Sequence, residues 1–270
     1  MTGIHFPQKR FGQNFLTNQY YATRIIDSLE LSPEDSLVEI GPGRGILTKI
    51  LSRVNCKDKI ALEIDPQLID YLQKEFSPHI RILQQDILTF SFKEIYKQAG
   101  KSVKVVGNIP YNITSPIIFH ILDNSSYISR AVLMVQKEVA ARLTADKDSK
   151  EYGILTVMVN SQAKVENLFD VGRKNFFPIP KVDSTVVRLT INSDQLEYDS
   201  QFDTRLFKTI VQSTFNNRRK MLKNTLKKII TDNQLNMIKS VSLNDRPENL
   251  SLEDFRNLTR EIWQLKQINP

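Results

Sequence analysis

The sequence has a single cysteine, Cys56, and only three histidines. One cysteine cannot form an internal disulfide, and it excludes a metal cluster held by several thiolates. The histidines stand at positions 5, 79 and 120, without the close spacing that metal-ligating histidines usually show. We therefore expect a protein that works without a metal ion.

Long apolar runs are also missing. No run approaches the length of about 18 residues that a membrane-spanning helix needs. The first 16 residues lack the apolar core of a secretory signal, so we expect a cytoplasmic protein. Hydrophobic residues make up 40% of the chain and charged residues 25%, which is typical of a globular protein with an ordinary core.

Positive charge is concentrated near the C-terminus. The net charge is +7, and residues 201–270 hold 13 Lys and Arg against 7 Asp and Glu, so +6 of it lies there. Residues 1–200 hold the remaining 24 basic and 23 acidic side chains and are close to neutral. A basic appendage on a neutral domain favours a polyanionic partner.

A glycine-rich turn follows the first apolar run, residues 37–40. Gly41, Gly43 and Gly45 are spaced by one residue each, and a helical pattern over 46–54 follows at once. A strand, a tight glycine turn and a helix N-terminus form a nucleotide-binding corner. The spacing G-x-G-x-G, with Glu39 two positions before the first glycine, resembles the S-adenosylmethionine loop of Rossmann-like methyltransferases.

Two acidic residues follow later strands of the same predicted sheet. Glu63 ends the second strand, 20 positions after Gly43, where an acid can accept both hydroxyls of a ribose. Asp86 lies just past the third strand, where an acid can accept a hydrogen bond from an adenine amino group. The two acids together predict that a nucleoside binds at the carboxyl edge of the sheet.

The rhythm of strands and helices predicts an α/β fold with a Rossmann-like sheet of seven strands. The expected strands are residues 37–40, 59–65, 80–83, 103–106, 131–135, 154–159 and 185–189, the last two as an antiparallel edge pair. From about residue 199 the pattern is helical only. We therefore expect a catalytic domain over 1–198, with an ordered N-terminal arm folded over the glycine turn, and a small all-helical domain over 199–270.

The tetrapeptide Asn108-Ile109-Pro110-Tyr111 lies at the mouth of the fourth strand. The exocyclic amine of adenine is a poor nucleophile because its lone pair is delocalised into the ring. The Asn108 side-chain oxygen and the Ile109 carbonyl can hold such an amine while it reacts, and Tyr111 can stack on the base. These residues predict methyl transfer to a planar amine, driven mainly by positioning.

Together these motifs resemble the ribosomal RNA adenine dimethyltransferase family along nearly the whole chain. The matching pieces are FGQNFL at 11–16, EIGPGRGILT at 39–48, LEID at 62–65, QDIL at 85–88, GNIPYNI at 107–113, FFPIPKVDS at 176–184, FNNRRKML at 215–222 and RPENLS at 246–251. The resemblance implies S-adenosyl-L-methionine as cofactor, bound by Gln13, Asn14, Leu16, Gly41, Glu63, Ile64, Asp86 and Asn108.

The resemblance also implies that Asn108, Tyr111 and Phe176 hold the target adenine. The motif register favours Phe176 over Phe177, but the sequence leaves that choice open. The implied product is a pair of adjacent dimethyladenosines near the 3′ end of 16S (small-subunit) ribosomal RNA, made by a monomer acting on a pre-assembled small subunit.

The segment 215–228 carries six basic residues and no acid. Met221, Leu222 and Leu226 at helical spacing predict an apolar helix face, so the basic side chains should mostly project outward. We expect this face to bind RNA phosphates through Arg218, Arg219, Lys220 and Lys223.

Two alternatives stay open. One is the related large-subunit RNA methyltransferase that confers macrolide resistance. The evidence against it is the presence of the motifs FNNRRKML and RPENLS. The other is a non-enzymatic RNA-binding assembly factor or transcription factor with the same fold. The evidence against it is the presence of Glu63, Asp86 and the 108–111 motif.

Overall fold

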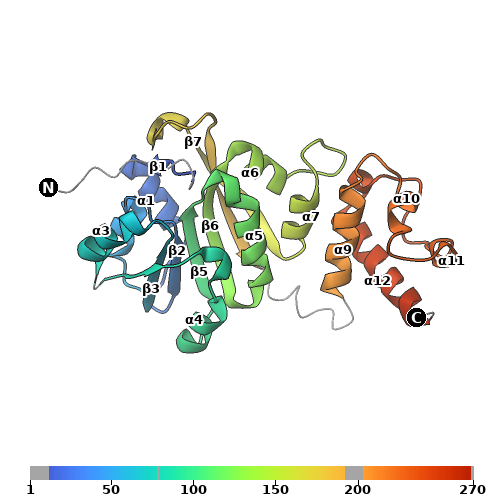
Figure 1. Cartoon of the computed structure of the whole chain (residues 1–270), viewed down its shortest axis with the longest axis horizontal. Helices are drawn as coiled ribbons and strands as arrows, with labels where there is room; N and C mark the ends of the chain where they lie inside the picture. Colours follow the sequence, from blue (N-terminus) through green and yellow to red (C-terminus); the bar gives the residue numbers. More distant parts are fainter. Residues whose placement is uncertain (1–11, 78, 192–202, 269–270) are drawn as a thin grey trace. The chain divides into compact units, whose positions relative to one another are not determined.

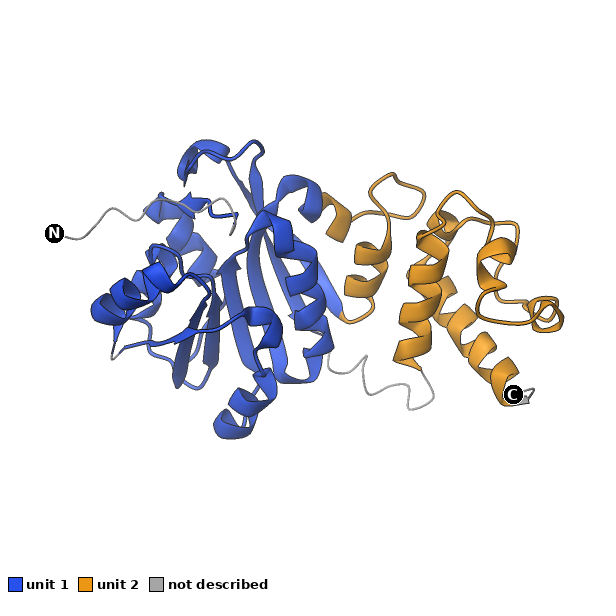
Figure 2. Ribbon diagram, in the orientation of Figure 1, with its two compact units in different colours: residues 1–140, 163–193 blue, residues 141–162, 194–270 orange. Residues whose placement is uncertain are grey.

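The computed structural model describes residues 12–77, 79–191 and 203–268 (Figure 1). The chain divides into two compact units (Figure 2). Unit 1 comprises residues 1–140 and 163–193, and unit 2 comprises residues 141–162 and 194–270. The division expected between 198 and 199 lies outside the described residues. Residues 141–162, which the sequence pattern assigned to the first domain, group with the C-terminal helices.

Unit 1 is built on a seven-stranded sheet, as predicted. The strand order is β4-β3-β2-β5-β6-β9-β7. The first five of these strands run parallel, and β9 and β7 are antiparallel to their neighbours. The strands are β2 Ser36–Ile40, β3 Asp58–Glu63, β4 Arg81–Gln84, β5 Val103–Asn108, β6 Ile128–Gln136, β7 Ala163–Val171 and β9 Ser184–Ile191.

Helices cover both faces of this sheet. Apolar side chains of α1, α2 and α3 pack with the sheet in one core, and α4 and α5 lie on the opposite face (Figure 1). Parallel strands buried on both faces are nearly continuous apolar runs, and β2 is buried at all five positions. The helices are α1 Gln19–Asp27, α2 Ile46–Leu51, α3 Pro66–Phe76, α4 Phe92–Ala99, α5 Thr114–Asp123 and α6 Lys137–Leu143.

One predicted strand was wrong. Residues 154–159 form helix α7, Ile154–Asn160, and the edge strand of the antiparallel pair is β7 instead. A short run buried on every side satisfies a strand or a helix equally well, and all of 155–159 is buried. The helical start is fixed locally, because the Gly153 amide donates to the Thr156 hydroxyl at 3.1 Å. The sequence did not predict strand β7 because most of its side chains are exposed or only partly buried, as is usual for an edge strand.

A second, two-stranded sheet ties the N-terminal arm to the FFPIP loop. Strand β1, Phe15–Leu16, pairs antiparallel with β8, Phe176–Phe177. The Thr17 amide and hydroxyl both donate to the Asn175 carbonyl, at 2.9 and 3.0 Å. Residues 12–17 of the expected arm thus lie against the FFPIP loop, whereas residues 1–11 lie outside the described residues.

Unit 2 is helical from residue 203 onward, as predicted. Besides α7 it contains α9 Thr204–Phe215, α10 Leu222–Leu226, α11 Asp232–Leu235 and α12 Leu252–Ile268. Its core joins aromatic rings from separate segments: Phe215 lies 5.9 Å from Tyr152 and 5.8 Å from Phe255 between ring centroids. None of the helices within the described ranges is both long and apolar enough to cross a membrane.

Candidate active site

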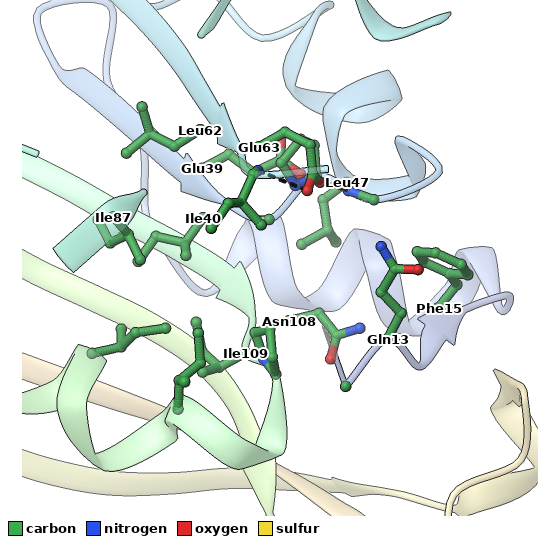
Figure 3. A pocket seen from close by; sticks show the side chains of 18 of the residues that line it. Gln13, Phe15, Glu39, Ile40, Leu47, Leu62, Glu63, Ile87, Asn108 and Ile109 are labelled. Carbon is green, nitrogen blue, oxygen red and sulfur yellow. Dashed lines mark hydrogen bonds between the residues drawn. The ribbon is translucent and has the colours of Figure 1, made fainter. Parts of the chain in front are cut away.

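A pocket opens at the carboxyl edge of β2, β3 and β5, within unit 1 (Figure 3). In parallel sheets this edge is where ligands bind, because the loops that follow neighbouring strands converge there. All eight residues expected to bind the cofactor line this pocket, and Tyr111 lines it too. They come from five separate stretches of chain: 12–16, 39–47, 62–64, 85–87 and 108–117.

The glycine turn forms one wall. Gly41 and Gly43 have φ angles of 63° and 57°, which side-chain-bearing residues rarely adopt. A Cβ on Gly43 would lie 2.8 Å from the Phe15 ring, so this glycine lets the N-terminal arm close over the turn. A Cβ on Gly41 would meet nothing within 4 Å. The space beside Gly41 therefore belongs to the pocket, and a ligand can approach its backbone closely.

Glu63 closes the end of β3 as a fixed acceptor. Its carboxylate accepts from the backbone amides of Gly43, Ile64 and Asp65 at 3.1, 2.9 and 2.9 Å. The contact with Gly43 explains the 20-residue spacing seen in the sequence. Burial raises the pKa of Glu63, and the three amide bonds oppose that rise. The carboxylate is thus held in one orientation on the pocket wall.

The arm is fastened to this wall through Asp65. The Gln13 side-chain amide donates to one oxygen of Asp65 at 2.9 Å. The other oxygen accepts from the backbone amide of Gln67 at 3.1 Å and so caps the N-terminus of helix α3. Asp65 is fully buried and anchors the arm, a role that the sequence did not single out.

Asp86 caps a turn and also presents a carboxyl oxygen to the pocket. One oxygen accepts from the Leu88 amide at 2.9 Å and caps the short 3-10 turn Ile87–Thr89. The other has no hydrogen-bond partner among the residues that the structure describes, and Asp86 lines the pocket. One oxygen of Asp86 thus caps the turn, and the other can accept a hydrogen bond from a ligand.

Asn108 is oriented by the arm. Its side-chain amide nitrogen donates to the Asn14 carbonyl at 2.7 Å, which leaves the side-chain oxygen as an acceptor for a ligand. Tyr111 is fixed by a 2.9 Å hydrogen bond between its hydroxyl and that of Ser184, the first residue of β9. Burial raises the pKa of Tyr111, so it stays a neutral phenol at neutral pH.

The two aromatic residues of the FFPIP loop occupy different environments. Phe176 is 2% exposed and packs in the core, and it does not line the pocket. Phe177 is 47% exposed. The Arg44 guanidinium lies 4.9 Å from the ring centroid of Phe15 and 5.2 Å from that of Phe177. Neither Arg44 nor this stack was anticipated from the sequence.

Glu39, the acid that precedes the glycine turn, is buried in the wall of the pocket. It is 1% exposed, and neither carboxyl oxygen makes a hydrogen bond within the described parts of the chain. The hydroxyl and the backbone amide of Thr48 on α2 lie close enough to favour the ionised form of Glu39, although neither forms a hydrogen bond of normal geometry with it. Burial, with the charge of Glu63 as a further cause, raises the pKa of Glu39 to about 8. The sequence signals were its place two positions before Gly41 and its position inside the apolar run 37–40.

The basic segment of unit 2, residues 215–228, is helical only in part. Helix α9 ends at Phe215 and α10 begins at Leu222, with turns between them. Arg218 does not project freely outward. It pairs with Glu248 and donates to the carbonyls of Ser149 and Lys150 at 2.8 and 2.7 Å.

These contacts join two matching motifs, FNNRRKML and RPENLS, with the loop before α7. Arg219 and Lys220 are exposed, and neither has an ion-pair or hydrogen-bond partner through its side chain in the described part of unit 2. The Lys223 ammonium donates to the Asn244 side-chain oxygen at 3.0 Å. Arg218 therefore has a structural role, whereas its two neighbours are available to a partner.

Among the described residues, no group of three or more His, Cys, Asp or Glu side chains is arranged to hold a metal ion. The pocket instead offers carboxylates, amide groups and glycine backbone. That donor set suits an organic ligand with hydroxyl, amino and cationic groups.

Comparisons with known proteins identify the relatives of this chain. The family model described as ribosomal RNA adenine dimethylase matches residues 5–264. Ribosomal RNA small subunit methyltransferase A of Chlorobium chlorochromatii is 41% identical, over 93% of this chain and 92% of the relative. The enzyme of the same name from Marinobacter nauticus is 40% identical, over 93% and 90%.

Two solved structures are similar over most of their length. A dimethyladenosine transferase from Plasmodium falciparum has a TM-score of 0.73 and 26% identity, covering 90% of this chain and 95% of that one. The 23S rRNA methyltransferase ErmE has a TM-score of 0.68 and 26% identity, covering 92% and 99%. With a family model spanning nearly all of its sequence, this chain belongs to the ribosomal RNA adenine dimethylase family.

Proposed function

We propose that this protein transfers methyl groups from S-adenosyl-L-methionine to the exocyclic amines of two adjacent adenosines near the 3′ end of 16S ribosomal RNA. The observation that carries the proposal is the convergence of Asp86, Glu63, Gly41 and Asn108 on one pocket at the carboxyl edge of the sheet. Family membership and relatives named small subunit methyltransferase A support the substrate class.

The pocket fits the cofactor part by part. The strand order places Asp86, Glu63, Gly41 and Asn108 in a row, after β4, β3, β2 and β5. Asp86 has an oxygen free to accept from the adenine amino group, and Glu63 presents an oriented carboxylate to the ribose hydroxyls. The open space at Gly41 and the unpartnered carboxyl of Glu39 lie where the methionine part belongs.

The chain's contribution to the reaction is positioning. The bound cofactor supplies an activated methyl group together with its own leaving group. The Asn108 oxygen and the Ile109 carbonyl accept from the adenine amine and orient its lone pair toward the methyl group. Tyr111, held by Ser184, presents its ring to the base. Because the target base must leave its stack to enter the pocket, an aromatic partner on the opposite side stabilises it.

Two observations point to different residues as this aromatic partner. The motif register favours Phe176, whereas exposure favours Phe177, because a ring that is 2% exposed offers no face to an incoming base. The single variants at these two positions separate the possibilities and are developed in the Discussion.

Unit 2 supplies RNA binding in this proposal. Residues 201–270 carry +6 of the net charge, and Arg219, Lys220 and Lys223 present cations for phosphates. Arg218 shapes this surface through its contacts with Glu248 and the 149–150 carbonyls. The substrate is a pre-assembled small subunit, since recognition by shape needs folded RNA. The protein acts as a monomer in the cytoplasm.

The experiment uses small ribosomal subunits from cells that lack this modification. Incubation with the protein and S-adenosylmethionine should produce dimethyladenosine, detected by mass spectrometry of digested RNA and located by primer extension. Asn108→Ala is the matched variant: it should still bind subunits but lose most turnover, because its oxygen acts on the reacting amine. Full turnover by this variant, or no product with wild type, would contradict the proposal.

A second candidate is methylation of large-subunit RNA, which the similarity to ErmE favours. The relatives at about 40% identity are instead named small subunit methyltransferase A. Offering isolated large subunits in the same assay separates the two substrates. The third possibility, RNA binding without catalysis, predicts tight subunit binding with no methyl transfer at any cofactor concentration.

A further inference from the structure

The loop between β7 and β9, residues 172–183, exposes several large apolar side chains. Ile179 is 63% exposed and Phe177 is 47% exposed, and Val182 is exposed as well. Neither Ile179 nor Val182 lines the cofactor pocket. Large apolar side chains that are exposed together on one loop mark a contact surface for a partner.

Cations flank these apolar residues. Arg173, Lys174 and Lys181 are exposed on the same loop. Asp183 is the only acid of the loop, and it accepts a hydrogen bond from the Arg173 backbone amide at 2.8 Å. The ammonium groups of Lys174 and Lys181 have no ion-pair or hydrogen-bond partner among the residues that the structure describes. These two cations are therefore available to an anionic partner.

The tip of the loop is anchored at both ends. Phe176 and Pro180 are buried, and the exposed residues 177–179 lie between them. The Arg173 guanidinium donates to the Lys181 carbonyl at 3.2 Å and closes the base of the loop. Because these contacts already restrict the loop, binding a partner there costs little conformational entropy.

The loop borders the cofactor pocket. Its strand β8 pairs with β1 of the N-terminal arm, and Phe177 lies directly opposite Phe15 (Figure 1). Phe15 and Arg44 line the pocket, and the Arg44 guanidinium lies 5.2 Å from the ring centroid of Phe177. The nucleotides next to a base in the pocket therefore lie within reach of this loop.

Apolar side chains between cations match the chemistry of a single RNA strand. Unstacked bases pack on apolar side chains, and the phosphates that join the nucleotides pair with cations. We propose that the 172–183 loop binds the RNA strand beside the target adenosine, with Lys174 and Lys181 on phosphates and Ile179 against a neighbouring base. This inference rests on the proposed function, because the strand is the one whose base enters the pocket.

Contacts of this kind do not read the identity of a base. They suit a strand that must present two adjacent adenosines to one pocket in turn. The position of the loop beside a pocket for adenine favours RNA over an acidic protein as the partner.

The first test measures binding to small ribosomal subunits that lack the modification. Changing Lys174 and Lys181 together to Ala should reduce the slope of log affinity against log salt by about 1.4, the value for two phosphate contacts on a single strand. Calorimetric affinity for S-adenosylmethionine should be unchanged, because neither lysine lines the pocket. The matched control changes Lys74 and Lys97 to Ala, which removes two exposed cations from α3 and α4 and should keep the wild-type slope.

Ile179 is tested by the rate of methylation. Ile179→Ala should lower the single-turnover rate at limiting subunit concentration about fourfold, the loss expected when roughly one methylene group is no longer buried. Ile179→Leu keeps an apolar side chain and should restore most of the rate. A full rate in Ile179→Ala would overturn the contact with a base, and a wild-type slope in the lysine variant would overturn the phosphate contacts.

Cross-linking locates the loop on the RNA independently of the methylation rate. Ile179→p-benzoylphenylalanine should form adducts next to the two methylated adenosines, read as stops in primer extension. The same photoreactive group at exposed Tyr96 on α4 should form none there. Adducts from position 179 only elsewhere in the RNA, or only with a ribosomal protein, would overturn this inference and leave the proposed function in place. A wild-type protein that made no dimethyladenosine would overturn both.

Discussion

Replacing Glu39 by glutamine should stabilise the cofactor-free protein at neutral pH. Burial raises the pKa of Glu39 to about 8 from 4.5. Between these values the folded protein binds more protons than the unfolded chain, so the free energy of unfolding falls as pH rises. Glutamine keeps the shape of the protonated side chain but has no proton to lose. The variant should therefore escape this loss.

The magnitude follows from the linkage. Each pH unit between the two pKa values corresponds to about 1.4 kcal/mol. Between pH 5.5 and 7.5 wild type should lose roughly 2.5 kcal/mol of unfolding free energy relative to Glu39→Gln, with the slope flattening near pH 8. Such a change is a large fraction of the stability of a typical domain, about 5–15 kcal/mol.

The assay must report on unit 1. The single tryptophan, Trp263, lies in α12 of unit 2, so its fluorescence follows the wrong unit. Hydrogen exchange of backbone amides in β2 and β5 measures the opening of the central sheet directly. Wild type and variant are compared at the same pH, which cancels the intrinsic pH dependence of exchange. Equal pH dependence in both proteins would refute the buried, neutral carboxyl at Glu39, and Glu75→Gln controls for the loss of one negative charge.

Three further predictions concern the proposed function. Glu63→Gln should weaken S-adenosylmethionine binding at least tenfold by calorimetry, because hydrogen bonds to a charged acceptor contribute about 1.5–3 kcal/mol each; unchanged affinity in a folded variant would remove Glu63 from the ribose site. Of Phe176→Leu and Phe177→Leu, the variant at the base-stacking position should slow single-turnover methylation and leave cofactor affinity unchanged; wild-type rates in both would require another way of holding the base. Changing Arg219 and Lys220 together to Ala should weaken subunit binding and reduce the slope of log affinity against log salt by about 1.5; an unchanged slope would place the RNA contacts elsewhere.

The sequence predicted the parts of the site whose chemistry is encoded locally. The glycine turn at 41–45 needs positive φ angles, and only glycine supplies three of them in five residues. Glu63 and Asp86 follow apolar strands, and the rule that parallel strands end on one edge was enough to bring them together. Gly41, Glu63, Ile64, Asp86 and Asn108 line the pocket for this reason, whereas Gln13, Asn14 and Leu16 reach it from the N-terminal arm.

The predictions from the sequence failed where a local pattern of residues is compatible with two different structures. The run 154–159 is apolar at every position but Thr156, so periodicity could not distinguish strand from helix. The segment 215–228 has helical spacing on both sides of a break, and the turn at 216–221 is set by long-range contacts. Arg218 reaches Glu248 and the 149–150 carbonyls, which lie 30 and about 70 residues away in the sequence.

What the sequence by itself determined is the place along the chain of six of the seven strands and the chemical type of each rim residue, because backbone preferences and hydrophobic periodicity act over a few neighbours. Only the tertiary structure decided what each side chain faces. It buried Phe176 and exposed Phe177, turned the amide nitrogen of Asn108 toward Asn14, and left Glu39 without a partner. Burial and hydrogen-bond pairing depend on segments distant in sequence, and they set the pKa of Glu39 and the availability of each acceptor.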